Sequence, residues 1–370
     1  MKHTIIGRNT NGFYRYQGWP TVCKDENGVL YTVCSGNRLG HLCIFGKNYL
    51  YKSFDGGESW TPPMIINDTY LDDRDAGITY LGGGKMLLTY FCHPWQFYAE
   101  RKQWVEGYTN ATTRAMAYSM LEGYANMPEE RNKYGSFVRL SRDYGNTWEE
   151  AVKVPVTAPH GPILLKNGKL LFVGKEFHSK DEELSQGAIY VYESADDGKT
   201  WQKLCGIDFP EGLDRTNMHE PHAVELEDGT IVAAIRAQGE GVPHKFSIFT
   251  CVSTDGGKSF SHPECLGISG SPPHFLLHSS GALILTYGRR EAPFGERIMI
   301  SRDGGKSWGE EHILTEAYCN DLGYPATVEL EDGSLVTVYY ERYCEDKFTS
   351  MLSVKWTIEE FEKKELTNQL

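Results

Sequence analysis

The sequence predicts an all-β protein, a β-propeller with six blades. The pattern Ser-x-Asp-x-Gly-x-x-aromatic occurs five times in the 370 residues. Between its copies lie six segments in which two extended apolar runs flank a turn that contains glycine. Together the two patterns give a period of about 50 residues with four strands in each unit, which is typical of a β-propeller.

The six segments have the alternation and the Asn-Gly, Asp-Gly or other glycine-containing turn of a β-hairpin. The first reads WPTVCKDENGVLYTVCSG and the fourth reads EPHAVELEDGTIVAAIR. We expect each hairpin to supply the inner strands of one blade. In chain order the hairpins cover residues 19–36, 75–91, 161–174, 220–236, 272–288 and 324–341.

A copy of the Ser-x-Asp pattern follows each of the first five hairpins. Ser and Asp side chains can bond nearby backbone N–H groups, and glycine adopts positive φ readily. We therefore expect a tight turn at each copy, with the aromatic residue packed against the sheet. The copies are residues 53–60, 141–148, 194–201, 253–260 and 301–308.

The remaining segments complete a single domain. Residues 94–135 interrupt the second unit and are expected to be a loop that is partly helical. The sixth unit lacks the Ser-x-Asp pattern, so the N-terminal segment should add a strand to it and close the ring. We predict one propeller domain over residues 1–357, including the insertion, and a polar C-terminal tail over residues 358–370.

The charge, the cysteine content and the first residues limit the kinds of binding partner and the cellular compartment that we expect. The net charge is −13 without a basic patch, which argues against nucleic acid and anionic membranes as partners. The nine cysteines include no Cys-x-x-Cys pair, which favours a reducing compartment over a disulfide or zinc framework. The first twenty residues lack a basic flank followed by an apolar stretch, so we expect a cytoplasmic protein. The sequence leaves the oligomeric state open.

Five such patterns on a six-bladed propeller resemble the sialidase (neuraminidase) superfamily, whose BNR or Asp-box repeats have this form. The resemblance covers nearly the whole chain. It implies that the repeated turns join the outer strands of each blade, away from the active site. Non-catalytic and other glycan-active propellers carry the same repeat, so the repeat identifies the architecture more than the activity.

Residues at the starts of the inner strands form a column when the hairpins are aligned on their turn glycines. This column contains an aspartate, a glutamate and a tyrosine, so one ring of strand starts gathers three reactive side chains. The shorter third unit offers His160 or Gly161. In the other units the column reads Trp19, Asp75, Glu220, Pro272 and Tyr324.

These residue types match the sialidase machinery. The resemblance implies that Asp75 is the acid/base, Tyr324 the nucleophile and Glu220 the base that deprotonates it. A sialoside bears a carboxylate on its anomeric carbon, so a phenolic nucleophile meets less repulsion than a carboxylate would; sialidases are the tyrosine exception among glycosidases. The implied reaction is retaining release of a terminal acidic sugar, a sialic acid or a related nonulosonic or uronic acid, without a cofactor.

Arginines are the second part of the implied site, because the planar guanidinium binds a carboxylate bidentately. The resemblance implies Arg236, sixteen residues after Glu220, and one of the adjacent pair Arg289 and Arg290. That pair would point to opposite faces of an extended strand, so we expect only one of the two in the site.

The sequence departs from the sialidase pattern at the first arginine. Where sialidases have a Phe-Arg-Ile-Pro motif, this chain has Gln-Gly-Trp-Pro, with Gly18 in the arginine's place. Arg38 or Arg15 could substitute. Arg74, beside Asp75, is a further candidate for substrate binding or for a local ion pair.

Histidines at inner strand starts are a second departure. His160, His222 and His274 could hold sugar hydroxyls or a second acidic group. No His-x-x-x-His or His/Cys cluster has the spacing of metal ligands, so we predict no metal.

Three functions remain open from the sequence alone. The reactive column favours a sialidase-like exo-glycosidase acting on an acidic glycan. The glycine at position 18 favours a non-hydrolytic carbohydrate-binding propeller, or a glycosidase or lyase acting on another sugar through the histidines.

Overall fold

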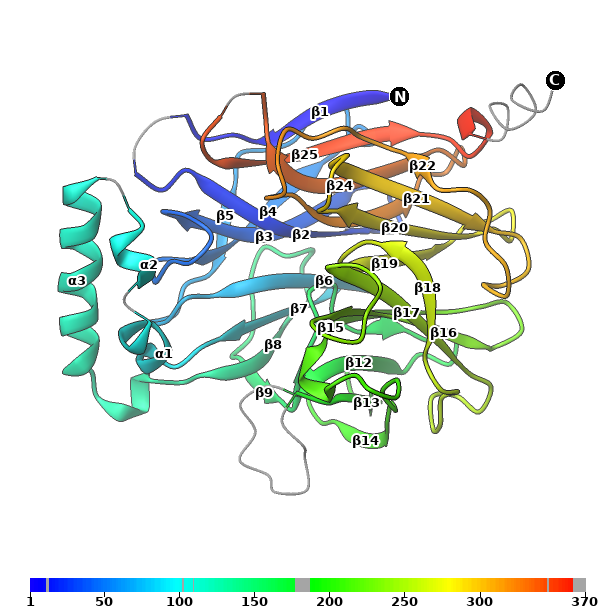
Figure 1. Ribbon diagram of the computed structural model, residues 1–370, viewed down its shortest axis with the longest axis horizontal. Helices are drawn as coiled ribbons and strands as arrows, with labels where there is room; N and C mark the ends of the chain where they lie inside the picture. The colour runs from blue at the N-terminus through cyan, green and yellow to red at the C-terminus, as the bar shows by residue number, and fades with distance from the viewer. Residues whose placement is uncertain (11–12, 102, 109, 177–186, 345, 362–370) are drawn as a thin grey trace.

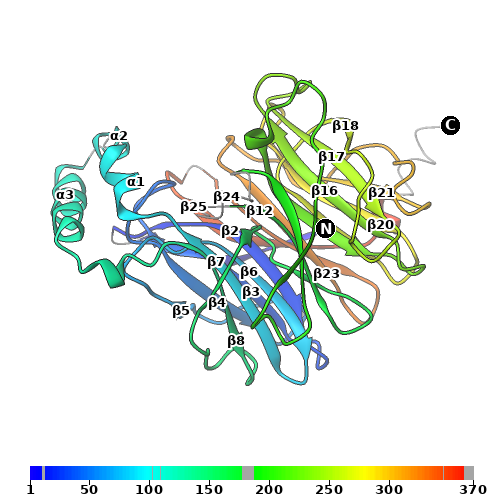
Figure 2. The same cartoon turned by 90° about the horizontal axis from the view of Figure 1, so that it is seen from below.

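The computed structural model describes residues 1–370 except 11–12, 102, 109, 177–186, 345 and 362–370. Within the described residues the strands form six sheets, which we call blades one to six (Figures 1 and 2). An inner strand of each blade contacts an inner strand of the next, and blade six contacts blade one, so the ring is closed. The predicted six-bladed β-propeller is confirmed.

The first three blades follow the chain order. Blade one consists of β2 (Tyr16–Lys24), β3 (Leu30–Arg38), β4 (Lys47–Ser53) and β5 (Met64–Asn67). Blade two consists of β6 (Arg74–Gly82), β7 (Lys85–Cys92), β8 (Gly135–Ser141) and β9 (Val152–Val154). Blade three consists of β10 (Val156–Thr157), β11 (Ile163–Leu164), β12 (Leu170–Glu176), β13 (Ile189–Ser194) and β14 (Gln202–Gly206).

The last three blades complete the ring. Blade four consists of β15 (Met218–Glu225), β16 (Ile231–Gln238), β17 (Phe246–Ser253) and β18 (Glu264–Ser269). Blade five consists of β19 (Pro273–Leu277), β20 (Leu283–Arg289), β21 (Gly295–Ser301) and β22 (His312–Ile313). Blade six consists of β23 (Gly323–Glu329), β24 (Leu335–Arg342), β25 (Thr349–Trp356) and β1 (Lys2–Gly7). β1 pairs antiparallel with β25, so the N-terminal segment closes the last blade as predicted.

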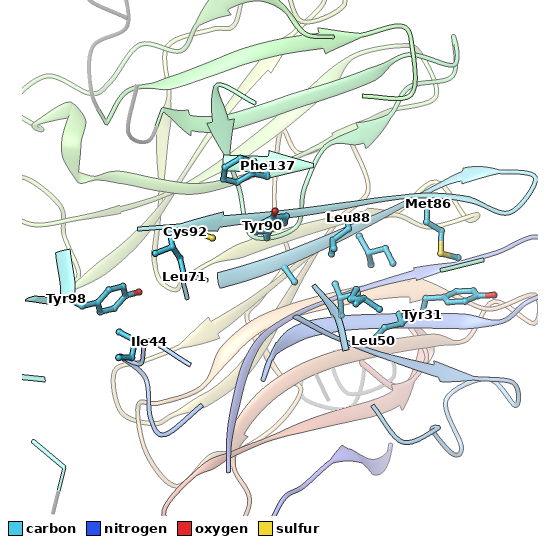
Figure 3. Packing of buried hydrophobic residues seen from close by; sticks show 14 of the residues in the cluster. Tyr31, Ile44, Leu50, Leu71, Met86, Leu88, Tyr90, Cys92, Tyr98 and Phe137 are labelled. Carbon is cyan, nitrogen blue, oxygen red and sulfur yellow. The ribbon is translucent and has the colours of Figure 1, made fainter. Parts of the chain in front are cut away.

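The core lies between the blades. Each of six buried hydrophobic clusters combines residues from two neighbouring blades. Successive residues of a strand serve opposite neighbours: on β7, Leu87 packs toward blade three and Leu88 toward blade one. Side chains of a strand point alternately to its two faces, so a single apolar strand packs its blade against both neighbouring blades. Figure 3 shows the cluster between blades one and two, including Tyr31, Leu50 and Met86.

The insertion in blade two forms α1 (Trp95–Glu100), α2 (Gln103–Glu106), α3 (Ala111–Ala125) and the short η1 (Glu129–Arg131). Asn110 caps α3, because its side-chain oxygen accepts from the backbone N–H groups of Thr112 and Thr113 at 2.9 and 3.1 Å. The helices lie together at one edge of the propeller, beside blades one and two (Figures 1 and 2). The predicted partly helical insertion is confirmed. No helix among the described residues is long and apolar enough to cross a membrane.

The five Ser-x-Asp turns join the last two strands of blades one to five. In blade five, Ser301 donates to Asp303 at 2.8 Å, and Gly305 N donates to Ser301 Oγ at 2.8 Å. The backbone N–H and the hydroxyl of Ser307 both donate to Asp303, at 2.8 and 2.5 Å. The same four bonds recur in the other four turns.

The polar tail predicted over residues 358–370 is described only as far as residue 361. There Phe361 is buried against Trp356 of blade six. The rest of that prediction, residues 362–370, lies outside the described residues.

Candidate active site

The predicted column of strand starts shares one unusual backbone conformation. Trp19, Asp75, Glu220 and Tyr324 have φ values of 57°, 47°, 48° and 53°, a left-handed region that non-glycine residues seldom occupy. At each of these positions the pairing of the first strand with the second slips out of register. Such a bulge turns a side chain away from the regular pleat. The same bulge with a positive φ value therefore redirects the side chain at the equivalent position of four blades.

Tyr324 and Glu220 meet at this ring although they lie 104 residues apart in the chain. The phenolic OH of Tyr324 donates to Glu220 Oε1 at 2.5 Å. Arg236, on β16 of the same blade as Glu220, donates to the other carboxylate oxygen, Oε2, at 2.5 Å. Arg236 also donates to Gln238 at 2.6 Å. Glu220 is thus held between a phenol and a guanidinium.

The two partners shift the pKa values of the pair in opposite directions. Burial alone would raise the pKa of Glu220, but the charge of Arg236 and the hydrogen bond from Tyr324 lower it to about 2. Burial, the charge of Glu220 and that of Asp75 raise the pKa of Tyr324 well above its usual value. At neutral pH the pair therefore rests as a carboxylate and a protonated phenol.

Asp75 belongs to the same electrostatic group. Its side chain is buried, and its Oδ1 has no hydrogen-bond partner among the described residues. Burial raises the pKa of Asp75 to about 6; Arg74 opposes the shift and Glu220 adds to it. A carboxyl that titrates near the working pH can both donate and accept a proton, as an acid/base residue must.

The two adjacent arginines of blade five diverge, as the strand alternation predicts. Arg290 donates to Tyr340 OH at 3.1 Å, and its guanidinium lies 5.4 Å from the centre of the Tyr324 ring. Arg289 instead donates to Glu311 at 2.8 Å. Arg290 is therefore the member of the pair that lies at the candidate site.

Two tyrosines and an aspartate lie around Gly18, where the first sialidase arginine was expected. A Cβ on Gly18 would lie 3.3 Å from Tyr340 and 3.4 Å from Tyr16. Both tyrosines donate to Asp321, at 3.3 and 2.9 Å, and Tyr16 OH also bonds His41 at 2.9 Å. The space beside Gly18 is therefore filled by two tyrosine rings, whose hydroxyl groups are bonded to Asp321.

Arg38 does not take the place of the absent arginine. It is fully buried, and both of its terminal nitrogens donate to Asp72, at 2.5 and 3.0 Å. Tyr98 of α1 donates to the same carboxylate at 2.6 Å, which anchors the helical insertion here. Arg74 lies 3.4 Å from Asp72 and stacks on Trp19, with 4.4 Å between the guanidinium carbon and the ring centre. The expectation that Arg38 replaces the first arginine is therefore corrected, because its hydrogen-bonding edge is occupied by Asp72.

The three predicted histidines lie together in a buried group. His222 and His274 stack with ring centres 4.3 Å apart, and His160 lies 4.9 Å from His274. Burial lowers the pKa of His160 to about 3 and those of the other two well below the usual value, so all three rings are neutral at pH 7. Backbone N–H groups of Phe275 and Thr327 donate to the Nδ1 atoms of His222 and His274. The three predicted histidines therefore form one buried, neutral group.

The comparison with known families agrees with this architecture. The family described as a BNR repeat-like domain matches residues 98–337. The chain belongs to this family. A sialidase of Bacteroides fragilis (strain YCH46) is 25% identical over an alignment of 224 residues, with 54% of this chain and 38% of the relative covered. The chain thus matches well under half the length of that curated relative.

Solved structures share the fold of this BNR repeat-like chain. A Dyadobacter fermentans protein of unknown function has a TM-score of 0.75 at 21% identity, with 96% of this chain and 97% of that one covered. The NanB sialidase of Streptococcus pneumoniae has a TM-score of 0.66 at 14% identity, with 96% and 70% covered. An α-L-arabinofuranosidase of Fusarium graminearum has a TM-score of 0.63 at 13% identity, with 97% and 98% covered.

Lys175 is a charged residue of this BNR propeller that lies at the site and that the alignment of strand starts did not reveal. Lys175 on β12 and His219 on β15 line a cavity of about 80 Å³ together with Asp75 and Glu220. A second column would have found Lys175, because it stands seven residues after its turn glycine, as Arg236 does. Tyr340 occupies the same position in blade six.

Within the described residues, no group of three or more His, Cys, Asp or Glu side chains is arranged to hold a metal ion.

Proposed function

We propose that this BNR propeller is a retaining exo-glycosidase that releases a terminal acidic sugar. The observation that carries the proposal is the hydrogen-bonded series Tyr324–Glu220–Arg236, with Asp75 on a nearby blade of the same ring. A phenol bonded to a carboxylate is a nucleophile with its base already in place.

In the first step Glu220 accepts the phenolic proton and the oxygen of Tyr324 attacks the anomeric carbon. The bond to the leaving oxygen breaks, and Asp75 gives that oxygen its proton. In the second step Asp75 takes a proton from water, which attacks the anomeric carbon and displaces Tyr324. Glu220 then returns the proton to the phenolate. Inversion at both steps leaves the sugar with its original configuration.

An acidic sugar would also activate the base. At rest, Arg236 lowers the pKa of Glu220 to about 2, which makes Glu220 a weak proton acceptor. A substrate carboxylate that shares Arg236 competes with Glu220 for the positive charge. The pKa of Glu220 then rises, and the proton of Tyr324 becomes easier to transfer.

The local charge also favours an anion, although the chain as a whole carries −13. The Arg38–Asp72 pair balances itself. Among the other described residues, four cations interact with Tyr324 or Glu220, whereas the carboxylates of the group are Glu220 itself and Asp75. The cations are Arg74, Arg236, Arg290 and Lys175. A local excess of positive charge draws an acidic ligand.

A substrate panel tests the proposal. Chromogenic α-sialosides, β-glucuronides and α-L-arabinofuranosides are offered to the wild type, to Tyr324→Phe and to Asp75→Asn. Turnover of an acidic glycoside that falls by about 10³-fold or more in Tyr324→Phe is expected, since the phenylalanine lacks the nucleophilic oxygen. Tyr318→Phe is the matched control, because Tyr318 is 73% exposed. Acidic-glycoside turnover that survives Tyr324→Phe would disprove the tyrosine mechanism.

A neutral sugar is the second candidate, and the surroundings of Gly18 favour it. The tyrosines and Asp321 there offer hydroxyl and carboxylate groups, which suit sugar hydroxyls better than a carboxylate. A structural neighbour is an α-L-arabinofuranosidase. If the protein hydrolyses only the arabinofuranoside, the substrate is a neutral sugar and not an acidic one. If it hydrolyses none of the three glycosides, a carbohydrate-binding propeller is favoured.

A further inference from the structure

Lys175 is a buried cation with one hydrogen bond left to make. Its side chain is on β12, and the residue is only 8% exposed. The ammonium group donates to the carbonyl oxygen of Thr216 at 2.7 Å and to His219 Nδ1 at 2.9 Å. An ammonium carries three N–H groups. The third has no partner among the described residues, and an unmet buried charge is costly.

His219 adds a second unmet donor. Since its Nδ1 accepts a hydrogen bond from Lys175 and its pKa is lowered by burial to about 3, the neutral ring carries its proton on Nε2. That Nε2 is buried and has no partner among the described residues. Two donors without acceptors therefore lie beside each other.

Both residues line the cavity of about 80 Å³ that Asp75 and Glu220 also line. On this measure one water molecule needs only about 10–15 Å³, so the cavity has room for a small substituent. The remaining wall is formed by Phe91 and the stretch 157–159, which offer mostly apolar surface. The cavity is thus a small compartment beside the reacting groups, with unmet donors in its wall.

We propose that Lys175 is a specificity-determining residue that binds an acceptor oxygen of the sugar, a carboxylate or an acyl carbonyl oxygen. This inference deepens the proposed function and rests on the sugar lying between Asp75 and Glu220. Lys175 stands in blade three where Arg236 stands in blade four, so neighbouring blades present two cations to different substituents of one ring. An unsubstituted neutral sugar leaves the third N–H of Lys175 unmet and is disfavoured.

Binding of free sugars tests this inference apart from turnover. N-acetylneuraminic acid, its analogue with a hydroxyl in place of the acetamido group, and glucose are titrated by ligand-observed NMR. The wild type is compared with Lys175→Met, which keeps the apolar stem, and with Lys199→Met as control, because Lys199 is exposed on the same blade. A lost charge-assisted hydrogen bond should weaken binding of the acids by about 10- to 100-fold in Lys175→Met, with no change in Lys199→Met.

The two acids identify the oxygen. Equal losses for both acids assign the carboxylate to Lys175, and a loss confined to the acetamido sugar assigns the acyl carbonyl. Unchanged affinity in Lys175→Met, an equal loss for glucose, or no binding of either acid by the wild type would overturn the inference. Lys175-dependent binding without hydrolysis would sink the proposed function alone, and hydrolysis with an unchanged KM in Lys175→Met would sink the inference alone.

A second readout needs no variant and covers the case in which Lys175→Met does not fold. Burial lowers the pKa of Lys175 to about 8. Binding of the acids by the wild type should therefore weaken as the pH rises past that value, with the midpoint moved upward by the bound anion, and pH-independent binding between pH 7 and 10 would contradict the inference. The charged groups that face Lys175 are Glu220, Arg236, Glu176 and Asp214, and the neutral but titratable His219 faces it as well. Lys175→Gln is the second variant for the titration.

Discussion

Asp303 in an outer turn and Asp75 in the inner ring are the same residue type in repeats of the same protein, but their surroundings are opposite. Asp303 lies at the surface and accepts hydrogen bonds from Ser301 and Ser307, which lower its pKa to about 2. Asp75 is buried with an unpartnered oxygen, and its pKa is raised to about 6. The Ser and Asp side chains of the outer turn satisfy one another's hydrogen bonds, whereas Asp75 keeps an oxygen without a partner among the described residues. Regularity alone marks architecture, whereas a buried carboxyl with a raised pKa marks a candidate site of chemistry.

The largest effect should follow from changing the inner ring at Glu220. Glu220→Gln keeps the shape but cannot accept the proton of Tyr324, so kcat should fall by about 10²- to 10⁴-fold on whichever glycoside the wild type hydrolyses. Glu225→Gln, on the same strand, should leave kcat unchanged. Steady-state kinetics measure both. Equal kcat values in wild type and Glu220→Gln would show that Glu220 takes no part in catalysis, so that the inner ring would differ from the outer turns in structure but not in chemical function.

The histidine group should make the inner region sensitive to acid. Burial keeps the folded pKa values of His160, His222 and His274 below that of the unfolded chain, so the unfolded state gains protons first as the pH falls below 6.5. Each ring then costs about 1.4 kcal/mol of stability per pH unit, down to its folded pKa. The free energy of unfolding of His274→Asn, from urea titrations, should fall about 2 kcal/mol less than that of wild type between pH 6.5 and pH 5.

This comparison must be made between variants, because buried carboxyls act the other way. Burial raises the pKa of Asp73 to about 7, so acid favours its folded state. His262→Asn, at an exposed loop position, is the control. An identical pH dependence in wild type and His274→Asn would mean that His274 is protonated in the folded protein.

The pH–rate profile should carry the signature of Asp75. As the general acid, Asp75 must be protonated, so kcat/KM should fall about tenfold per pH unit above the pKa of about 6. Glu220 must be ionised, and its pKa of about 2 places the opposite limb below the usual range of assay. In Asp75→Asn the residual rate should lose the limb near pH 6. A limb that persists in this variant would assign the titration to another group.

The smallest effect is expected in an outer turn. Asp303→Ala removes the acceptor for three hydrogen bonds at the surface of blade five. The midpoint of thermal unfolding, read by circular dichroism, should fall by about 1–4 °C. The values of kcat and KM should not change, because the turn lies at the far side of its blade. Altered kinetics at an unaltered midpoint would contradict the division between outer and inner repeats.

Local patterns were sufficient to predict the fold. Alternating strands and glycine turns are properties of short segments, and a period that recurs along the chain needs no knowledge of distant contacts. The same register also placed Asp75, Glu220 and Tyr324 in one column, and the structure brings Glu220 and Tyr324 into hydrogen-bond contact. Their chemical roles remain predictions.

Long-range pairing is what the sequence could not supply. Arg38 is bound by Asp72, 34 residues away, and Arg289 is bound by Glu311, 22 residues away. No local sequence pattern predicts either pair. The bulge that redirects the side chain of Asp75 could not be predicted either, because a bulge is a shift in the pairing between two strands and not a pattern within one of them. Lys175 went unnoticed because the alignment considered first strands and not second strands.

The pairing of β1 with β25 has a consequence for how the protein is made. β1 spans residues 2–7, but its partner β25 spans residues 349–356, so β1 cannot pair until the five other blades have been synthesised. Until β25 is made, the backbone of β1 is open to pairing with other chains. Domains begin to fold as they emerge during synthesis, so slow synthesis prolongs the exposure of β1. Yield of soluble protein should therefore depend on expression rate more than the stability of the finished ring would suggest.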